Sequence, residues 1–310
     1  MRWLKRGTYG LLALIAFGCV AYWWLLVESH KASAASYAID IAKVRQLSGS
    51  LAGDKPKLIK IETVGHLSAP QVFVVSGDGW KSVDLPVSSY ELVYGDHFIV
   101  VDTAFDGRLA KSMSATEFDN VSYARVSRAL GGAALILVTH EHPDHVGGLL
   151  AQPTFKENLM GVARLTREQV AVIKSNLQTN AFAALHLPSG LFDAYRPLDY
   201  DRYLAIAPGV VLIKAPGHTP GSQMIYVRRA DGVEFLFLGD VAWQMRNVET
   251  VREKARLVTW MAEEDRNQVR KELAGLAQLH ERHPELHMVP GHDAGTIASY
   301  LKDGLLVKGF

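Results

Sequence analysis

The first residues of the chain form its longest apolar stretch. Residues 7–27 carry no charged side chain, whereas Arg2, Lys5 and Arg6 precede them. A run of about 20 apolar residues is long enough to cross a bilayer as a helix. Tryptophans at positions 23 and 24 lie where aromatic side chains gather at a membrane interface. Because a basic amino end stays on the cytoplasmic side, we expect the rest of the chain to face the outside.

Two forms of export remain open for this segment. Ala32-Ser33-Ala34 has the small-residue pattern of a cleavage site, which predicts a secreted mature chain. The apolar run exceeds the roughly 7–15 residues usual for a cleaved signal, which favours a retained membrane anchor. We therefore expect residues 1–35 to be a signal anchor or signal peptide, residues 36–55 to be a polar tether, and residues 56–310 to form one domain.

Beyond residue 56, short β-branched runs alternate with longer amphipathic segments. Strands are expected at residues 57–64, 71–75, 90–94, 98–101, 133–138, 210–214, 223–228, 233–238 and 286–289. Helices are expected at residues 39–46 (within the tether), 122–130, 166–176, 180–187, 266–282 and 295–302. Asp231-Gly232, between two expected strands, is a strong hairpin signal. Strands in both halves, each set followed by helices, predict an α/β domain.

Composition narrows the chemistry that this domain can perform. Hydrophobic residues make up 48% of the chain and charged residues 21%, as in globular proteins. The 33 basic and 32 acidic residues nearly cancel, which argues against a nucleic-acid partner. The single cysteine, Cys19, excludes both an intrachain disulfide and a zinc site built on cysteines. A transition metal would therefore need imidazole and carboxylate ligands, and the chain has 12 histidines.

Four potential metal ligands fall within six residues, directly after the strand expected at residues 133–138. They belong to the run His140-Glu141-His142-Pro143-Asp144-His145. A strand that ends in a tight loop can aim closely spaced side chains at one point outside the sheet. His140 and His142 can share one metal ion, and Asp144 and His145 can reach a second.

This His-x-His-x-Asp-His run resembles the signature of the metallo-β-lactamase superfamily. Four further segments resemble the other motifs of the superfamily, in the same order along the chain. Residues 98–103 resemble its early strand that ends in an aspartate, and residues 215–222 resemble its second histidine loop. Residues 236–240 resemble its strand that ends in a bridging aspartate, and residues 289–293 resemble its last histidine loop. The resemblance runs from about residue 57 to 302. It implies a four-layer αββα sandwich, with the metals at the edge where strand-end loops from both halves meet.

Carried over to this sequence, the resemblance implies a site for two metal ions. The ligands would be His140, His142 and His218 for one ion, Asp144, His145 and His292 for the other, and Asp240 as the bridge. Five imidazoles and two carboxylates suit two Zn²⁺ ions, with manganese or iron as alternatives. Asp102 would brace the metal loop rather than bind metal.

The implied activity is hydrolysis, in which two metals share a hydroxide that attacks a carbonyl or phosphoryl group. Asp144 would have a second, catalytic role in orienting the nucleophile or managing a proton. A bridging Asp240 resembles lactonases, glyoxalase-II-like thioesterases and phosphodiesterases, whereas true β-lactamases lack it. N-acyl homoserine lactonases carry a tyrosine three residues later, where this chain has Trp243. We expect a small ester, lactone or thioester substrate, with N-acyl homoserine lactones favoured.

Other activities stay open at this point. The chain could be a β-lactamase or phosphodiesterase of the same superfamily, or a membrane-tethered metal-binding protein without turnover. The apolar segment 181–195 is expected to form either a lid that accepts an acyl chain or an ordinary packing insert. Tyr195, Tyr203 and Trp243 are candidates for substrate contact.

Overall fold

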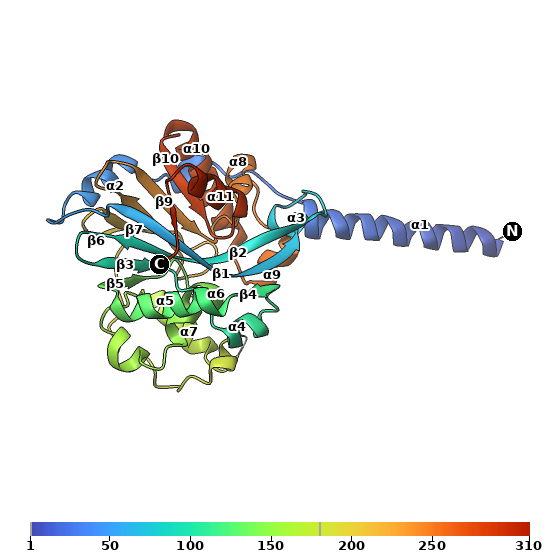
Figure 1. Ribbon diagram of the computed structural model, residues 1–310. Helices are drawn as coiled ribbons and strands as arrows, with labels where there is room; N and C mark the ends of the chain where they lie inside the picture. Colours follow the sequence, from blue (N-terminus) through green and yellow to red (C-terminus); the bar gives the residue numbers. More distant parts are fainter. Residues whose placement is uncertain (1, 180) are drawn as a thin grey trace.

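Two mixed β-sheets pack face to face in the computed structural model, which describes residues 2–179 and 181–310 (Figure 1). The first sheet has the strand order β11-β1-β2-β3-β5, with β4 paired to β1. Its strands are β1 (Leu58–Pro70), β2 (Ser82–Val93), β3 (Phe98–Val101), β4 (Glu117–Phe118), β5 (Leu135–Leu137) and β11 (Val307–Lys308). The second sheet has the order β10-β9-β8-β7-β6. Its strands are β6 (Tyr203–Ala207), β7 (Val210–Lys214), β8 (Gln223–Arg228), β9 (Glu234–Gly239) and β10 (Leu286–Pro290).

Helices cover the outer face of each sheet (Figure 1). The first sheet is covered by α4 (Gly107–Ser112), α5 (Asn120–Gly132), α6 (Pro143–Leu150) and α7 (Arg167–Asn176). The second is covered by α2 (Ile41–Ser48), α8 (Met245–Thr250) and α10 (Arg266–Arg282). Helix α11 (Ala294–Lys302) follows β10 and packs at the margin of the layer between the sheets. This confirms the predicted αββα sandwich.

The alternation of side chains along the strands fills three hydrophobic layers. Ile59 and Ile61 of β1 lie between the two sheets, in one cluster with Leu212 of β7 and Phe237 of β9. Val211, the neighbour of Leu212 in β7, belongs instead to the layer under α10. Successive side chains on a strand point to opposite faces, so a sheet covered on both faces needs apolar residues in unbroken runs. That requirement explains the continuous apolar character of the strand segments.

Of residues 71–75, predicted as a strand, the first four instead form the short helix α3 (Gln71–Val74). β1 and β2 extend beyond the predicted strands and pair as far as Pro70 and Ser82, so this segment lies in the hairpin connection. Val72 and Val74 are fully buried in two different apolar clusters. A helical turn points them to those two sites, and tertiary packing therefore overrides the strand propensity of β-branched residues.

The segment predicted as either a lid or a packing insert is part of the core. Within it, Ala181–Leu185 form a 3₁₀ turn where a helix was expected at 180–187, of which Asn180 lies outside the described residues. Phe182 and Phe192 are buried in the cluster beneath the first sheet. The Tyr195 hydroxyl donates to the Ala163 carbonyl at 2.8 Å. These contacts match the packing insert.

The residues expected to form a tether lie against the second sheet. Tyr37 is buried, and its hydroxyl donates to the Lys214 carbonyl at 2.5 Å. Its own carbonyl oxygen lies so close to α10 that a Cβ at Gly275 would come within 2.0 Å of it. Arg45 of α2 pairs with the buried Glu234 at 2.7 Å. Residues 37–48 therefore belong to the outer layer of the domain. Although most of their neighbours in the sequence are polar, the contacts of Tyr37 and Arg45 hold this segment against the second sheet.

The N-terminal apolar segment is a single helix that projects from the domain (Figure 1). Helix α1 (Arg2–Tyr22) continues into a π-helical turn at Trp23–Val27. Residues Thr8–Val27 have a mean hydropathy of 2.2, and their side chains are mostly exposed. Their length and composition are those of a membrane span or a signal sequence.

Candidate metal centre

The structure brings together the seven residues that the sequence analysis picked as metal ligands. They lie on loops that follow strands of both sheets: His140 and His142 after β5, Asp144 and His145 in the first turn of α6, His218 after β7, Asp240 after β9 and His292 after β10. His142 is partly exposed and the other six are buried. Strand ends from both sheets meet at this edge of the sandwich, so residues far apart in the sequence converge there.

Asp240 lies between two groups of potential ligands. The first group is His140, His142 and His218, and the second is Asp144, His145 and His292; the ligand atoms within each converge to within 4.8 Å. Oδ2 of Asp240 is 3.5 Å from His218 Nε2. Oδ1 of Asp240 is 3.3 Å from His145 Nε2 and 3.2 Å from His292 Nε2. A carboxylate whose two oxygens face different groups has the placement of a bridging ligand.

Among the described residues, the buried Nε2 atom of His140 has no hydrogen-bond partner. An unpaired buried polar atom costs roughly 1–3 kcal/mol, which a bound cation would offset. Imidazole nitrogens and carboxylate oxygens are a donor set that suits Zn²⁺ and neighbouring divalent metals. The donors present therefore fit a divalent metal, and this is a metal-binding cluster.

Acceptors outside the centre orient three of the histidines. His145 Nδ1 donates to Asp102 Oδ2 at 2.9 Å, and His218 Nδ1 donates to Glu264 Oε1 at 2.8 Å. His292 Nδ1 donates to a backbone carbonyl in β2 at 3.0 Å. Each contact places the ring proton on Nδ1 and leaves Nε2 free to bind metal.

Asp102 takes the bracing position that the sequence analysis expected. It follows β3 with a φ of 55°, a left-handed conformation that is uncommon outside glycine. Its carboxylate accepts hydrogen bonds from the Thr139 backbone N–H at 2.7 Å and from Thr139 Oγ1 at 2.8 Å, as well as from His145. The strained backbone thus aims one carboxylate at both the start of the metal loop and one of its histidines.

Glu141, which sequence reasoning did not single out, joins the first two histidine loops. Its buried carboxylate accepts hydrogen bonds from Thr219 Oγ1 at 2.9 Å and from the Gly221 N–H at 3.1 Å. Burial raises the pKa of Glu141 despite these contacts. The feature of the sequence that could have pointed to Glu141 is its position between His140 and His142. The loop there is too short to let the carboxylate reach solvent.

A buried ion pair supports His218 from behind. Lys254 Nζ lies 3.0 Å from Glu264 Oε1 and donates to the Asp240 backbone carbonyl at 2.6 Å. Burial alone would raise the pKa of Glu264, but the charges of Lys254 and His218 hold it below its usual value. No sequence motif marks Lys254 or Glu264, because their partners are separated from them in sequence.

A groove of about 390 Å³ opens beside the first ligand group. His142 and His218 lie on its wall with apolar residues that include Phe182 and Met261. Tyr195 and Tyr203, predicted as substrate-contact candidates, are not among its lining residues. The Tyr195 hydroxyl bonds backbone groups near α7, and the Tyr203 hydroxyl accepts from the Asp40 N–H.

Trp243 contacts the centre directly. Its indole Nε1 donates to Asp240 Oδ2 at 2.6 Å. We expect Trp243→Phe, which keeps a ring but removes the donor, to weaken metal binding roughly 10–100-fold, as is usual when a residue that supports a metal ligand is lost. Titration against a competing chelator would measure this. The same substitution at the exposed Trp260 is the matched control, and equal affinities for both variants would contradict the expectation.

Glu272 of α10 is buried beneath the loop that carries His218. It accepts a hydrogen bond from Gln268 Nε2 at 3.1 Å, and a Cβ at Gly217 would lie 2.5 Å from its Oε2. Burial raises the pKa of Glu272 from 4.5 to about 8, although Gln268, the Gly217 N–H and Arg202 all lower it. The carboxyl group is therefore largely neutral in the folded protein at pH 7.

Because of this raised pKa, we expect Glu272→Gln to increase the stability of the folded protein at high pH but not at low pH. The folded state keeps a proton that the unfolded chain releases above pH 4.5, so the stability tied to that proton is complete below pH 4.5 and is lost as the pH rises through about 8. The variant should match the wild type near pH 5 and exceed it above pH 8 by roughly 1–3 kcal/mol in free energy of unfolding. Urea unfolding at both pH values would test this, with the exposed Glu281→Gln on the same helix as control; a gain of equal size at both pH values would contradict it.

Comparison with known proteins agrees with this geometry. The family model described as the metallo-beta-lactamase superfamily matches residues 83–303, more than half of the chain. A probable metallo-hydrolase of Mycobacterium tuberculosis is 28% identical over 176 residues, 51% of this chain and 54% of that protein. The match therefore spans about half the length of this relative.

Solved structures share the fold at lower identity. An N-acyl homoserine lactone hydrolase with N-hexanoyl-L-homoserine bound at its catalytic metal centre has a TM-score of 0.59 at 18% identity, covering 79% of this chain and 96% of the other. A dizinc quorum-quenching lactonase has a TM-score of 0.55 at 13% identity, covering 76% and 87%. With the family model matched across both sheets and the ligand loops gathered at one edge, this chain belongs to the metallo-beta-lactamase superfamily.

Proposed function

We propose that this chain is a dinuclear metal-dependent hydrolase of a small ester, lactone or thioester, held at the membrane by its N-terminal helix. The observation that carries the proposal is the placement of Asp240, whose two carboxylate oxygens each face a different group of potential ligands. A closed structural zinc site needs four ligands and one ion. Seven converging donors with a shared carboxylate are more than one such ion requires.

The proposed ligands are His140, His142 and His218 for one ion, Asp144, His145 and His292 for the other, and Asp240 for both. Bound Zn²⁺ ions would supply Lewis acidity and bring the pKa of a water molecule towards neutrality. Asp144 Oδ2 lies 3.4 Å from His292 Nε2, at the edge of the second group. We assign Asp144 a further role in orienting the nucleophile or holding a proton as the ester or lactone opens.

The groove and the structural neighbours favour an acyl substrate. Phe182 and Met261 give one wall of the groove an apolar character, beside the ligand His142. The neighbouring hydrolase with N-hexanoyl-L-homoserine at its metal centre holds such an acylated product. An N-acyl homoserine lactone is therefore the first substrate to test. Trp243, which offers Asp240 an N–H but cannot act as an acid, separates this chain from lactonases with tyrosine there.

The test uses the full chain in detergent, because residues next to the helix pack into the domain. Metal content and turnover would be measured with lactone, thioester, β-lactam and phosphodiester substrates. We expect two ions per chain and turnover of a lactone or ester, with Asp144→Asn reducing turnover while at least one ion stays bound. Two bound ions without turnover of any substrate would instead favour a membrane-tethered metal-binding protein.

A further inference from the structure

The apolar helix contacts the domain at its carboxyl end. The last carbonyls of a helix lack partners within the helix. Here the Leu26 carbonyl accepts from the Gly77 N–H at 2.7 Å, and the Val27 carbonyl accepts from Arg252 Nη2 at 2.9 Å. Leu26 is also buried in an apolar cluster with Val72. These contacts hold the carboxyl end of the apolar segment against the domain.

A buried charge cluster follows directly. The carboxylate of Glu28 pairs with Arg256, Arg266 and Arg270. Burial alone would raise the pKa of Glu28, but the hydrogen bond and charge of Arg266, with the other two arginines, lower it to about 2. Because removing one partner from a buried ion cluster is costly, these contacts resist rotation of the domain about the helix end.

Large aromatic side chains surround the helix at this end. Trp80, in the connection between α3 and β2, donates through Nε1 to the Tyr22 hydroxyl at 3.2 Å, and Tyr22 lies within the apolar span. Trp260, at the end of α9 (Arg256–Met261), lines a cavity together with Trp24. Trp80 is 56% exposed and Trp260 71% exposed. Tryptophan is the residue type enriched where protein meets the headgroup level of a bilayer.

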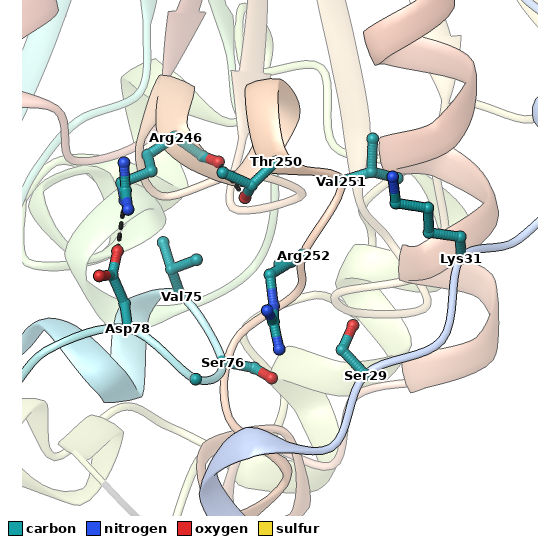
Figure 2. A pocket seen from close by; sticks show the side chains of 10 residues that line it. Ser29, Lys31, Val75, Ser76, Asp78, Arg246, Thr250, Val251 and Arg252 are labelled. Atoms are coloured by element: carbon teal, nitrogen blue, oxygen red, sulfur yellow. Dashed lines mark hydrogen bonds and ion pairs between the residues drawn. The ribbon is translucent and has the colours of Figure 1, made fainter.

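Cationic side chains lie where the chain leaves the helix. Figure 2 shows Lys31, Arg246 and Arg252 around a cavity of about 390 Å³ that Ser29 also borders. Arg246 pairs directly with Asp78 on one side of this cavity. Basic side chains next to a membrane helix are attracted to anionic headgroups. The same end of the domain thus combines aromatic and basic side chains around the helix exit.

Helix α9 connects this surface to the metal centre. Arg256 at its start lies over the Trp24 ring, 4.5 Å from the centroid. Met261 at its other end is 77% exposed and lines the groove that contains His142 and His218. In Figure 1, α9 and α3 lie beside the base of α1. One short helix therefore separates the apolar span from the mouth of the groove.

We propose that α9 and the connection carrying Trp80 rest in the bilayer interface, so that the groove takes its substrate from the membrane surface. Resting on the proposed hydrolase function, this identifies the substrate class as esters or lactones whose long acyl chain partitions into lipid. The acyl chain approaches across Trp260 and Met261, and the carbonyl group reaches the side of the groove that holds His142 and His218.

The membrane contact is tested without any activity measurement. In a Cys19→Ser background, Trp260→Cys and Leu51→Cys each provide a single labelling site at an exposed residue. Trp260 belongs to α9, beside the helix base, whereas Leu51 follows three residues after α2, and α2 lies on the opposite side of the domain from α1 (Figure 1). The full chain is labelled with an environment-sensitive fluorophore and reconstituted in phosphatidylethanolamine–phosphatidylglycerol vesicles. We expect an aqueous quencher to act at least several-fold more weakly on the label at position 260. Equal quenching at both positions, or cleavage of the helix, overturns the proposal.

The substrate class is tested with lactones that share a headgroup and carry either a short, water-soluble or a long, lipid-partitioned acyl chain. In vesicles we expect kcat/KM to favour the long chain. Trp260→Ser should lower that value about tenfold, the effect of losing one buried aromatic contact, and leave the short-chain value unchanged. Leu51→Ser should change neither. An equal loss for both lactones refutes the inference. A protected label without turnover of any lactone, ester or thioester refutes the proposed hydrolase and leaves the membrane contact standing.

Discussion

Replacing Asp240 with alanine is expected to empty the metal centre and to lower activity roughly a thousandfold or more. Among the residues that the structure describes, Asp240 is the carboxylate that faces both ligand groups. Burial alone would raise its pKa, but His292, His145 and His140 hold it well below the usual range, so it enters the centre as an anion. A bridging carboxylate stabilises two cations at once, and losing several kcal/mol of such stabilisation corresponds to about three powers of ten in rate.

The measurement is the number of ions per chain after dialysis, taken together with turnover. Alanine at the exposed Asp303 is the matched control and should leave both values unchanged. An Asp240→Ala protein that kept two tightly bound ions would show that Asp240 is not the bridge.

Gly291 offers a second way to disturb the same carboxylate without removing it. A Cβ at this position would lie 2.2 Å from Asp240 Oδ1 and 3.2 Å from the Gly239 carbonyl. Gly291→Ala should therefore push Asp240 away from His292. If the centre binds two ions as proposed, it should lower the affinity for the ion held by His292 more than for the other. Stepwise metal titration would resolve the two, and an unchanged second affinity would argue against this placement of Asp240.

The part of the centre that the sequence could predict is the part encoded locally. His140, His142 and His145 fall within six residues directly after a buried strand, so their spacing alone indicated a shared metal site. Asp240 was assigned to the same site only through the family resemblance, because nothing local links it to the histidine loop. The helix over residues 71–74 was missed because its valines have strand propensity, and only long-range packing of Val72 and Val74 turns the backbone. The docking of residues 37–48 was missed for the same reason, since its partners lie on β9 and α10.

Lys254 and Glu264 are the clearest case of contacts that no local sequence pattern predicts. Replacing Lys254 is expected to lower both stability and metal affinity. Lys254 is 1% exposed and the Glu264 side chain is fully buried, so their charges compensate each other out of contact with water. Lys254→Met keeps the apolar stem and removes the charge. The variant leaves Glu264 with His218 as its remaining partner, and breaking a buried pair in this way costs roughly 3–5 kcal/mol.

We therefore expect Lys254→Met to lose about that much free energy of unfolding in urea titration, and to bind metal more weakly because Glu264 no longer holds His218 in one orientation. Methionine at the exposed Lys302 is the control and should change neither quantity. The double variant Lys254→Met with Glu264→Gln removes the unpaired charge, so it should regain much of the stability while His218 stays poorly oriented. A double variant that regains stability but not metal affinity would separate the two roles of the pair, which are to neutralise a buried charge and to orient His218. A single variant as stable as the wild type would mean that Glu264 is protonated when alone, and that the pair contributes little to folding.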